Sequence, residues 1–445
     1  MQAKELIRKK REGLEHNPKE LATLVDTFLK GELKDYQMAA WLMAVFFKGL
    51  SAAEMHTLLQ LMWKSGSTLP RRHRNDYWID KHSTGGQGDK TSIILVPLVT
   101  AVLRRLFGPH CARIPMVSGR GLGRTGGTLD KLESVPGFRT DLTLDEAMAL
   151  LENNDFFMMA QTADFVPADR LLYSLRDATA TVDSIPLMAC SILSKKLAEN
   201  VDGLVLDAKL GCGAHLANPE DGRKVARLLV DLARGAGVDT VAIFSRMDEP
   251  LGYKVGNHLE LEECADFLSG TRRERGLREV VLNLAGLMVM LASRRKLSLQ
   301  EAIVECEKEL EECVCMDVFR QMFESQGGNW HLFEQNRGIL RSEMKFYVAK
   351  SPYPGYLQSI NASEVGQLIN ELGGGRNAKE DSIDPFVGIE FERKVGDRIE
   401  KGQSIATVYY RKLEQEKLIE HRLTNAFTIS SSAIAQSPWV LGMVE

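Results

Sequence analysis

The chain has 445 residues, of which 44% are hydrophobic and 26% are charged, and its formal net charge is −4. This composition is typical of a globular protein with enough apolar residues for the cores of two or three domains. The negative balance excludes a protein whose main task is to coat nucleic acid, because phosphate backbones require a basic surface. It still allows a local cationic pocket for a small anion.

The seven cysteines are odd in number and scattered along the chain. They form no His/Cys cluster with the spacing of a zinc site, so we expect free thiols, no bound metal and a cytoplasmic location. The first residues are charged and lack the apolar core of a signal peptide. No uncharged apolar stretch reaches the length of about 18 residues that a membrane span needs, so we expect no membrane partner.

The first 65 residues are predicted to be helical. Asn17-Pro18-Lys19-Glu20 combines a cap, a first-turn proline and a third-position acid, and apolar residues follow at helical spacing. Residues 36–48 form a second apolar-rich helix, and Ser51 to Glu54 is a capping box for another. A glycine, a proline and a basic run over residues 66–74 then predict a solvated linker.

From Tyr77 onward, short apolar runs alternate with predicted helices. The runs cover residues 77–79, 93–96, 114–117, 201–206 and 240–244. Such alternation predicts an α/β fold with a mostly parallel sheet and crossover helices. The runs after residue 340 resemble hairpins instead, with turns at Gly396-Asp397 and Gly402. We therefore expect a small helical lobe, a large mixed α/β lobe and a C-terminal β-rich (α+β) subdomain.

Two glycine-rich segments directly follow predicted strands. Residues 81–92 read KHSTGGQGDKTS and residues 118–128 read SGRGLGRTGGT. Glycines let the backbone approach a ligand and direct several N–H groups at one point, and the helix after each loop adds its positive end. One such loop would equally be a tight strand-to-helix turn. Two of them, each with cations and hydroxyls, favour a phosphate site.

The kind of phosphate is constrained by what the loops lack. Residues 121–126 match the dinucleotide pattern GxGxxG, but no clear acidic ribose ligand follows about 20 residues later. Neither loop has the Gly-Lys-Ser/Thr ending of a nucleoside-triphosphate loop. Inorganic phosphate or a phosphosugar is therefore the better interpretation.

A third segment begins at Arg176 and continues into a helix that Asp183 or Ser184 can cap. Ser191 and Lys195 are four residues apart and share one face of this helix. A cation and a hydroxyl there, with Arg176 just upstream, could read the carbonyl and imide edge of a pyrimidine. Spacing alone favours a plainer interpretation, in which Ser191 is a packing residue and Lys195 is exposed to solvent beside Lys196.

Together the three segments resemble the thymidine phosphorylase and pyrimidine-nucleoside phosphorylase family. The resemblance rests on KHSTGGxGD at residues 81–89, SGRGLGxTGGTLDKLE at residues 118–133, and the stretch from Arg176-Asp177 to SILSKK at residues 191–196. It extends over most of the chain, as far as the GGGR of residues 373–376.

The resemblance implies a division into three parts and a homodimer formed through the helical lobe. That lobe, residues 1–68 and 167–196, would bind the base. The α/β lobe, residues 69–166 and 197–340, would bind phosphate, and residues 341–445 would form the C-terminal subdomain. Closure of the cleft would bring the reactants together and exclude water.

The activity implied is reversible phosphorolysis of thymidine and deoxyuridine to the free pyrimidine base and 2-deoxy-α-D-ribose 1-phosphate, with inversion at the anomeric carbon and an oxocarbenium-like transition state. No cofactor is expected, because inorganic phosphate is itself the nucleophile. By resemblance, the phosphate ligands are Lys81, Ser83, Ser92, Ser118 and Thr128. The pyrimidine ligands are His82, Arg176, Ser191 and Lys195, of which His82, Arg176 and Lys195 are the expected catalytic residues.

The sequence departs from the family pattern at several positions of these loops. Gln87 replaces valine, Arg124 replaces histidine, and Cys212 in the run GCGAH of residues 211–215 stands where serine is expected. These departures concern loop closure and leave the expected reaction class unchanged.

Lys90 is a further departure. Some members with broad specificity carry threonine there and bind a monovalent cation through groups that map to Gly88, Leu251, Lys254 and Glu263. We expect the Lys90 ammonium to take the place of that cation, to pair with Glu263 and to leave no bound potassium. The plain alternative is a solvated side chain at a helix start.

Met116 bears on specificity, because dual-specificity members carry lysine at this position and thymidine-preferring members carry methionine. It favours thymidine and deoxyuridine over uridine. The alternatives left open are a broad-specificity phosphorylase that also uses uridine, a transferase similar to anthranilate phosphoribosyltransferase with a magnesium-pyrophosphate site, and a catalytically silent interaction protein on the same fold.

Overall fold

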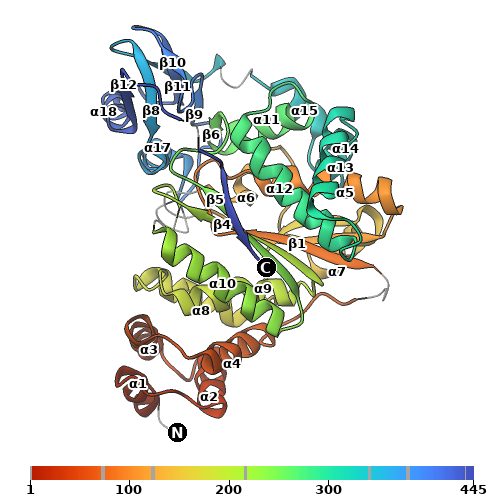
Figure 1. The fold of residues 1–445 in the computed structure, drawn as a ribbon. Coiled ribbons are helices and arrows are strands. Elements are labelled where there is room, and N and C mark those ends of the chain that lie inside the picture. The colour runs from red at the N-terminus through yellow and green to blue at the C-terminus, as the bar shows by residue number, and fades with distance from the viewer. Residues whose placement is uncertain are drawn as a thin grey trace.

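The structure is a computed structural model, and it describes residues 3–71, 76–121, 126–214, 218–338, 342–376, 381–435 and 437–445. Figure 1 shows a helical lobe at the bottom, a sheet flanked by helices in the centre and a small β-rich subdomain at the top. This arrangement confirms the predicted fold class. None of the described helices is long and apolar enough to cross a bilayer, and all seven cysteines are free.

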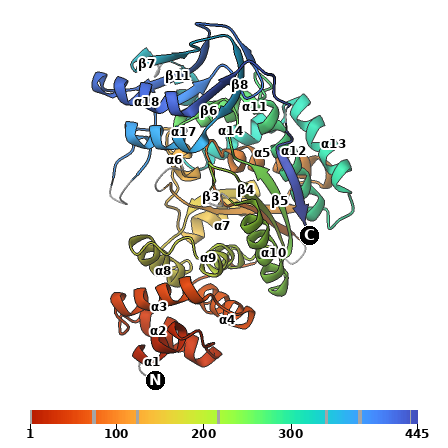
Figure 2. The same ribbon diagram turned by 60° about the vertical axis from the view of Figure 1, so that its left-hand side comes forward.

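The helical lobe begins with α1 (Ala3–Arg11), α2 (Pro18–Leu29), α3 (Asp35–Lys48) and α4 (Ala52–Trp63). The capping boxes predicted at Asn17 and Ser51 are both formed, each with the glutamate three residues later. The later helices α8 (Pro167–Ala178) and α9 (Ile185–Ala198) lie between these helices and the sheet (Figure 2). Ser184 is the N-cap residue of α9, although its hydroxyl makes no cap hydrogen bond.

The central sheet has the strand order β13-β5-β4-β1-β2-β3. Its strands are β1 (Tyr77–Ser83), β2 (Ala112–Ser118), β3 (Phe156–Ala160), β4 (Gly203–Leu210), β5 (Asp239–Arg246) and β13 (Val440–Val444). All neighbouring strands are parallel except β13, which runs antiparallel to β5. The mostly parallel sheet that the alternating pattern predicts is therefore confirmed.

Helices cover both faces of this sheet. On one face, α5 (Thr91–Phe107) and α12 (Arg275–Ala292) share a core with Val205 of β4. On the other face, α9 and α10 (Pro219–Gly235) share a core with Leu204 and Leu206, and this core continues into the helical lobe. The remaining helices of the α/β lobe are α6 (Thr128–Leu132), α7 (Leu144–Asn154), α11 (Asn257–Leu268), α13 (Leu299–Glu312), α14 (Cys315–Ser325) and α15 (Trp330–Asn336).

The apolar run at residues 93–96 is not a strand, and its assignment to the alternating strand pattern is wrong. It lies inside α5, which is buried on all sides from Ile93 to Leu103. Periodicity cannot separate a fully buried helix from a buried strand, because neither shows a polar face.

The C-terminal subdomain is β-rich, as predicted. Its two antiparallel sheets have the orders β10-β8-β12 and β6-β9-β11-β7. Its elements are β6 (Lys254–Val255), β7 (Lys345–Lys350), β8 (Gly355–Ile360), α17 (Ala362–Ile369), η1 (Asn370–Gly374), β9 (Gly388–Phe391), β10 (Arg398–Ile399), β11 (Ser404–Tyr410), η2 (Leu413–Gln415), α18 (Glu416–Ala426) and β12 (Phe427–Ser430). The strand β6 comes from the middle of the chain and joins a sheet of this subdomain, whereas β13, at the C-terminal end, joins the central sheet. The α/β lobe and the C-terminal subdomain therefore each include a strand from the other's part of the chain.

Candidate active site

The two glycine-rich loops lie at the same edge of the sheet, because β1 and β2 are parallel neighbours and each loop follows the carboxyl end of its strand. This edge is where open α/β sheets bind ligands. Close backbone approaches account for two of the glycines. A Cβ on Gly88, whose φ is +72°, would lie 2.4 Å from the Leu251 carbonyl oxygen, and one on Gly127 would lie 2.1 Å from the Gly121 nitrogen.

Three of the predicted phosphate ligands gather around the first loop. Lys81 Nζ donates to Thr91 Oγ1 at 2.7 Å and to Ser92 Oγ at 3.4 Å. The Ser83 hydroxyl donates to Asp89 Oδ2 at 2.5 Å. The loop therefore presents an ammonium and several hydroxyls as one cluster at the start of α5, where the helix dipole adds positive potential.

Charge within this cluster is balanced by carboxylates. Burial lowers the pKa of Lys81, while Asp89 and Asp207 oppose that effect. Burial alone would raise the pKa of Asp89, but the ammonium groups of Lys209 and Lys81 outweigh it, and the pKa is lowered. The cluster therefore holds charged groups in the protein interior.

Lys209 and Asp207 are residues of this cluster that the sequence analysis missed. Lys209 Nζ lies 2.6 Å from Asp207 Oδ2 and 3.7 Å from Asp89 Oδ2, and both β4 side chains are fully buried. Two charged side chains in a buried parallel strand are costly unless they are paired and hydrogen-bonded. That pattern, Asp-Ala-Lys inside an apolar run, was the signal available in the sequence.

Ser118 and Thr128 lie at the two ends of the second loop, at the last residue of β2 and the first residue of α6. Both are half-buried. Arg124 lies outside the described residues, as do His215 and most of the basic run of the predicted linker. The structure thus places Ser118 and Thr128 at the edge that carries Lys81, and among the described residues no hydrogen bond joins either hydroxyl to the Lys81 cluster.

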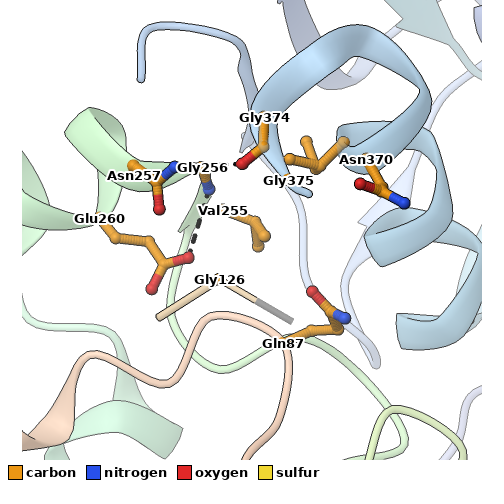
Figure 3. A pocket seen from close by; sticks show the side chains of 10 residues that line it. Gln87, Gly126, Val255, Gly256, Asn257, Glu260, Asn370, Gly374 and Gly375 are labelled. Carbon is orange, nitrogen blue, oxygen red and sulfur yellow. Dashed lines mark hydrogen bonds between the residues drawn. The ribbon is translucent and has the colours of Figure 1, made fainter. Parts of the chain in front are cut away.

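A residue of the C-terminal subdomain contacts the helix that follows the second loop. Arg376 Nη1 donates to Asp130 Oδ1 at 2.6 Å, and Asp130 Oδ2 accepts from the Gly121 amide at 2.6 Å. Asn257 Nδ2 donates to the Gly374 carbonyl at 3.1 Å, beside a small pocket between the loops and the subdomain (Figure 3). The pocket is lined by Gln87, Gly126, Val255, Gly256, Asn257, Glu260, Ile369, Asn370, Gly374 and Gly375.

The other departures from the family pattern also fall near this junction. The Cys212 thiol contacts the Asp248 carbonyl oxygen at 3.2 Å and lies 3.7 Å from Oδ1 of Asn361. Asn361 is the N-cap residue of α17. Gln87 is buried in the pocket wall.

The predicted pyrimidine ligands lie on α8, α9 and β1. Arg176 is buried, and its guanidinium donates to the carbonyl oxygens of Val182 at 2.7 Å and Leu187 at 3.1 Å. Burial lowers the pKa of Arg176, and Asp169 opposes that effect. Arg176 therefore organises the loop between the two helices as well as supplying positive charge.

Ser191 and Lys195 are in contact, with Lys195 Nζ 3.2 Å from Ser191 Oγ. Lys195 also forms an ion pair with the buried Asp169 of α8. Lys195 is half-buried and Lys196 is buried, so the interpretation of these lysines as a solvated surface pair is wrong. Spacing along one helix could not reveal the carboxylates that other elements bring to them.

His82 lies next to Lys81 on β1, and successive side chains of a strand point to opposite faces. Burial lowers the pKa of His82 well below its usual value, and the ammonium groups of Lys196 and Lys195 act in the same direction. The imidazole is therefore neutral near pH 7. β1 thus presents Lys81 to the glycine-rich loops and His82 to the side of α9.

The predicted pairing of Lys90 with Glu263 is present in the structure. Its ammonium donates to the carbonyl oxygens of Leu251 at 2.9 Å and Lys254 at 2.8 Å, and to Glu263 Oε2 at 2.6 Å. Burial alone would lower the pKa of Lys90, but Glu263 outweighs it and the pKa is raised. The solvated alternative is wrong, since Lys90 is buried.

Met116 is buried in the core that α5 and α12 share, two residues before Ser118 on β2. Alternate residues share a face of a strand, so Met116 and Ser118 lie on the same side.

Family models match each of the three parts of this architecture. Residues 4–66 match the helical bundle domain of the glycosyl transferase family, residues 75–313 match its a/b domain, and residues 356–430 match the C-terminal domain of pyrimidine nucleoside phosphorylases.

The chain is 39% identical to a pyrimidine-nucleoside phosphorylase of Geobacillus stearothermophilus over 442 residues, which is 99% of each chain. It is 40% identical to a thymidine phosphorylase of Agrobacterium fabrum over 432 residues, which is 96% of each. Anthranilate phosphoribosyltransferase from Thermus thermophilus shares the fold, with a TM-score of 0.56, 16% identity, and coverage of 72% of this chain and 99% of that one. The chain therefore belongs to the thymidine phosphorylase and pyrimidine-nucleoside phosphorylase family of pentosyltransferases.

Proposed function

We propose that this enzyme catalyses the reversible phosphorolysis of thymidine and deoxyuridine, giving the free pyrimidine and 2-deoxy-α-D-ribose 1-phosphate. The observation that carries the proposal is the two-sided character of β1. Lys81 and Ser83 belong to a cluster of cations and hydroxyls suited to phosphate, while His82 lies toward α9 with its Ser191 and Lys195. The relatives' names support the same reaction.

In this mechanism a phosphate oxygen attacks the anomeric carbon of the nucleoside. The bond from that carbon to the pyrimidine nitrogen breaks, and its electron pair leaves with the base. The base nitrogen takes up the proton that hydrogen phosphate releases when it becomes the sugar phosphate. Lys81, Ser83, Ser92, Ser118 and Thr128 hold the nucleophile, and most of the rate comes from placing it opposite the leaving group.

The departing pyrimidine carries the developing negative charge. Lys195 and Arg176 stabilise that charge, and Ser191 hydrogen-bonds the ring. His82, with its lowered pKa, acts as a neutral hydrogen-bond donor to a ring carbonyl and not as a source of a full proton. No metal or organic cofactor enters the scheme, and the Lys90 ammonium supplies the positive charge that a bound cation gives elsewhere in the family.

The preference for deoxynucleosides rests on Met116. This buried side chain offers no hydrogen-bonding group to a ribose hydroxyl, and sites that do provide such groups are the ones that select for the hydroxyl. Thymine release from thymidine, with and without phosphate and with uridine alongside, tests both claims. Phosphate-dependent release from thymidine alone supports them. Equal turnover of uridine overturns the preference, and absence of release from either overturns the reaction.

The same assay with a metal chelator separates this reaction from that of a magnesium-dependent phosphoribosyltransferase. Phosphorolysis should be unchanged by chelation, because phosphate is bound by side chains and backbone groups. Dependence on magnesium would favour the transferase.

The homodimer belongs to this proposal as well. Large apolar side chains are exposed on α3, namely Tyr36, Met43, Phe46 and Phe47, and Tyr173 is exposed on the neighbouring α8. An exposed apolar patch of this kind is typical of an interaction surface. A second copy of the helical lobe is the partner proposed here.

A further inference from the structure

Three charged side chains lie buried where α9 meets the central sheet. They are Asp80 on β1 and Lys196 and Glu199 on or next to α9, with side-chain exposures of 0%, 2% and 0%. Two of them directly neighbour a residue of the proposed site: Asp80 precedes Lys81, and Lys196 follows Lys195. These three residues are called the α9 triad below.

Lys196 sits at the centre of the α9 triad. Its ammonium forms an ion pair with Asp80, donates to Glu199 Oε1 at 2.8 Å, and donates to the Val117 carbonyl oxygen at 3.2 Å. The Val117 amide in turn donates to Glu199 Oε1 at 3.3 Å. Since Val117 directly precedes Ser118, the triad ties α9 to both strands that end in the phosphate loops.

The charges of the α9 triad do not balance if both carboxyl groups are ionised. One ammonium would face two carboxylates, leaving a net negative charge in the core, which is costly. In addition, Asp80 Oδ1 and Glu199 Oε2 are buried, and neither accepts a hydrogen bond from an N–H or hydroxyl donor of the described residues. Two ionised carboxylates cannot bond to each other, whereas a proton on one of them makes it a donor to the other.

The neighbouring cations are engaged elsewhere. Lys195 pairs with Asp169, and the Lys81 ammonium lies near Asp89 and Asp207. His82, the remaining titratable group on this stretch of β1, has no side-chain hydrogen bond to a described residue, and its neutral form adds no charge. In the described part of the chain, no other cation is therefore placed to balance the second carboxylate.

We propose that Asp80, Lys196 and Glu199 form one positioning unit that holds a single shared proton between its two carboxyl groups and aligns α9 with β1 and β2. Glu199 is the proton carrier, since burial and its hydrogen bond to Asp80 both raise its pKa, although Lys196 opposes them. The unit fixes the position of the base-binding residues on α9 relative to the phosphate-binding residues that follow β1 and β2. This consequence for catalysis rests on the proposed function, whereas the shared proton does not.

The shared proton predicts an unusual pattern of stability among amide variants. In Glu199→Gln, the amide oxygen can accept from Lys196 and Val117 while the amide nitrogen donates to Asp80, which reproduces the protonated acid. In Asp80→Asn, Glu199 ionises and pairs with Lys196. Each single variant should therefore keep its Tm close to that of the wild type.

The double variant Asp80→Asn/Glu199→Gln leaves the ammonium without a counter-charge. Its Tm should fall far more than the sum of the single effects. Adding Lys196→Met removes the uncompensated charge and should restore most of the lost Tm. Additive losses in the double variant, or large losses in each single variant, would mean two independent ion pairs and would overturn the proposal.

The pH dependence of Tm gives a second, substrate-free test. The ordinary pKa of glutamate is 4.5, so above that pH the unfolded chain releases a proton that the folded α9 triad keeps. The stability from this proton is complete below pH 4.5 and is lost as pH rises toward the folded pKa. Between about pH 5 and about pH 8, the wild-type Tm should fall relative to that of Glu199→Gln. A constant difference would show that Glu199 is ionised, which contradicts the shared proton.

The positioning role is tested with the triple variant, which lacks the charged unit but is expected to fold. Its kcat for phosphorolysis should be about tenfold or more below that of the wild type, because small misplacements of reacting groups are costly. Glu199→Gln should retain wild-type kcat. If restoring Tm in the triple variant also restores kcat, the unit is only structural. If the wild type itself shows no phosphorolysis, the proposed function fails while the Tm experiments still decide the shared proton.

Discussion

The ammonium of Lys90 lies 2.6 Å from Oε2 of Glu263, and 0% and 5% of the two side chains are exposed. The same ammonium donates hydrogen bonds to two backbone carbonyl oxygens of the segment that precedes α11. The Lys90 ammonium therefore links the first glycine-rich loop to the segment before α11.

Replacing Lys90 with methionine leaves Glu263 buried without its partner. We expect the free energy of unfolding to fall by about 3–5 kcal/mol, as for other broken buried pairs. Arg278→Met, which breaks the exposed ion pair with Glu307, should cost no more than about 1 kcal/mol in the same denaturation experiment. Equal losses in the two variants would contradict the buried-cation role.

Lys90→Thr introduces the side chain that the family resemblance associates with a bound monovalent cation. Its thermal stability and activity should rise when sodium is replaced by potassium, whereas the wild type should respond to neither ion. A potassium requirement in wild-type protein freed of metal would show that Lys90 does not replace the cation.

The Lys81 cluster predicts a selective defect in phosphate use. Lys81→Gln should lower kcat/KM for phosphate by about 10²–10³-fold, since it removes a fixed charge from a water-excluded site. Ser92→Ala should raise the phosphate KM with a smaller effect on kcat. Lys345→Gln, at an exposed position of β7, is the control that should change neither parameter. A defect confined to the nucleoside KM would show that Lys81 binds the nucleoside and not phosphate.

His82 predicts a pH effect on folding. Its pKa is lowered from an ordinary value of 6.5, so the folded protein resists protonation that the unfolded chain accepts. The stability it contributes is complete above pH 6.5 and is lost as pH falls toward the folded pKa. Thermal unfolding of His82→Asn should accordingly show a weaker loss of Tm below this ordinary pKa than the wild type. Parallel curves would show that His82 titrates normally.

Arg376 predicts communication between the C-terminal subdomain and the phosphate loop. Arg376→Ala frees Asp130, which orders the Gly121 amide, so the phosphate KM should rise several-fold while Tm changes by only a few degrees. The matched control is Arg411→Ala, which breaks the more exposed pair with Asp384 in the same subdomain. Similar kinetics for the two variants would exclude a role for the Arg376–Asp130 pair.

The exposed apolar patch predicts the oligomeric state. Phe47→Arg on α3 should convert a dimer into a monomer in sedimentation experiments, because Phe47 is 74% exposed in the single chain. Phe346→Arg on β7 changes a phenylalanine that is 65% exposed and should leave the dimer intact. A wild-type monomer, or a dimer that survives Phe47→Arg, would remove the patch from the interface.

Local signals predicted much of this molecule. The capping boxes at Asn17 and Ser51 and the two glycine loops depend on local motifs of side chain and backbone. The pairing of Lys90 with Glu263, 173 residues away, was expected only from the family resemblance. The buried helix α5 escaped prediction because a helix that is apolar all round has no diagnostic period.

The contacts between distant segments could not be predicted in the same way. Arg376 and Asp130 are 246 residues apart, and Asp80 and Lys196 are 116 apart. Each side chain looks like an ordinary surface charge in the sequence. Only the sheet order, which places β1 between β2 and β4, together with the packing of α9 against the sheet, makes these charges neighbours.

The pairing of β13 with β5 has a consequence for biosynthesis. β5 is complete by Arg246, but its outer edge is filled by residues 440–444, which leave the ribosome only after the whole β-rich subdomain. Domains generally begin to fold during translation, and an unpaired strand edge is a template for aggregation. The outer edge of β5 therefore stays unpaired for roughly 200 residues of synthesis, at a rate of about 5–20 residues per second.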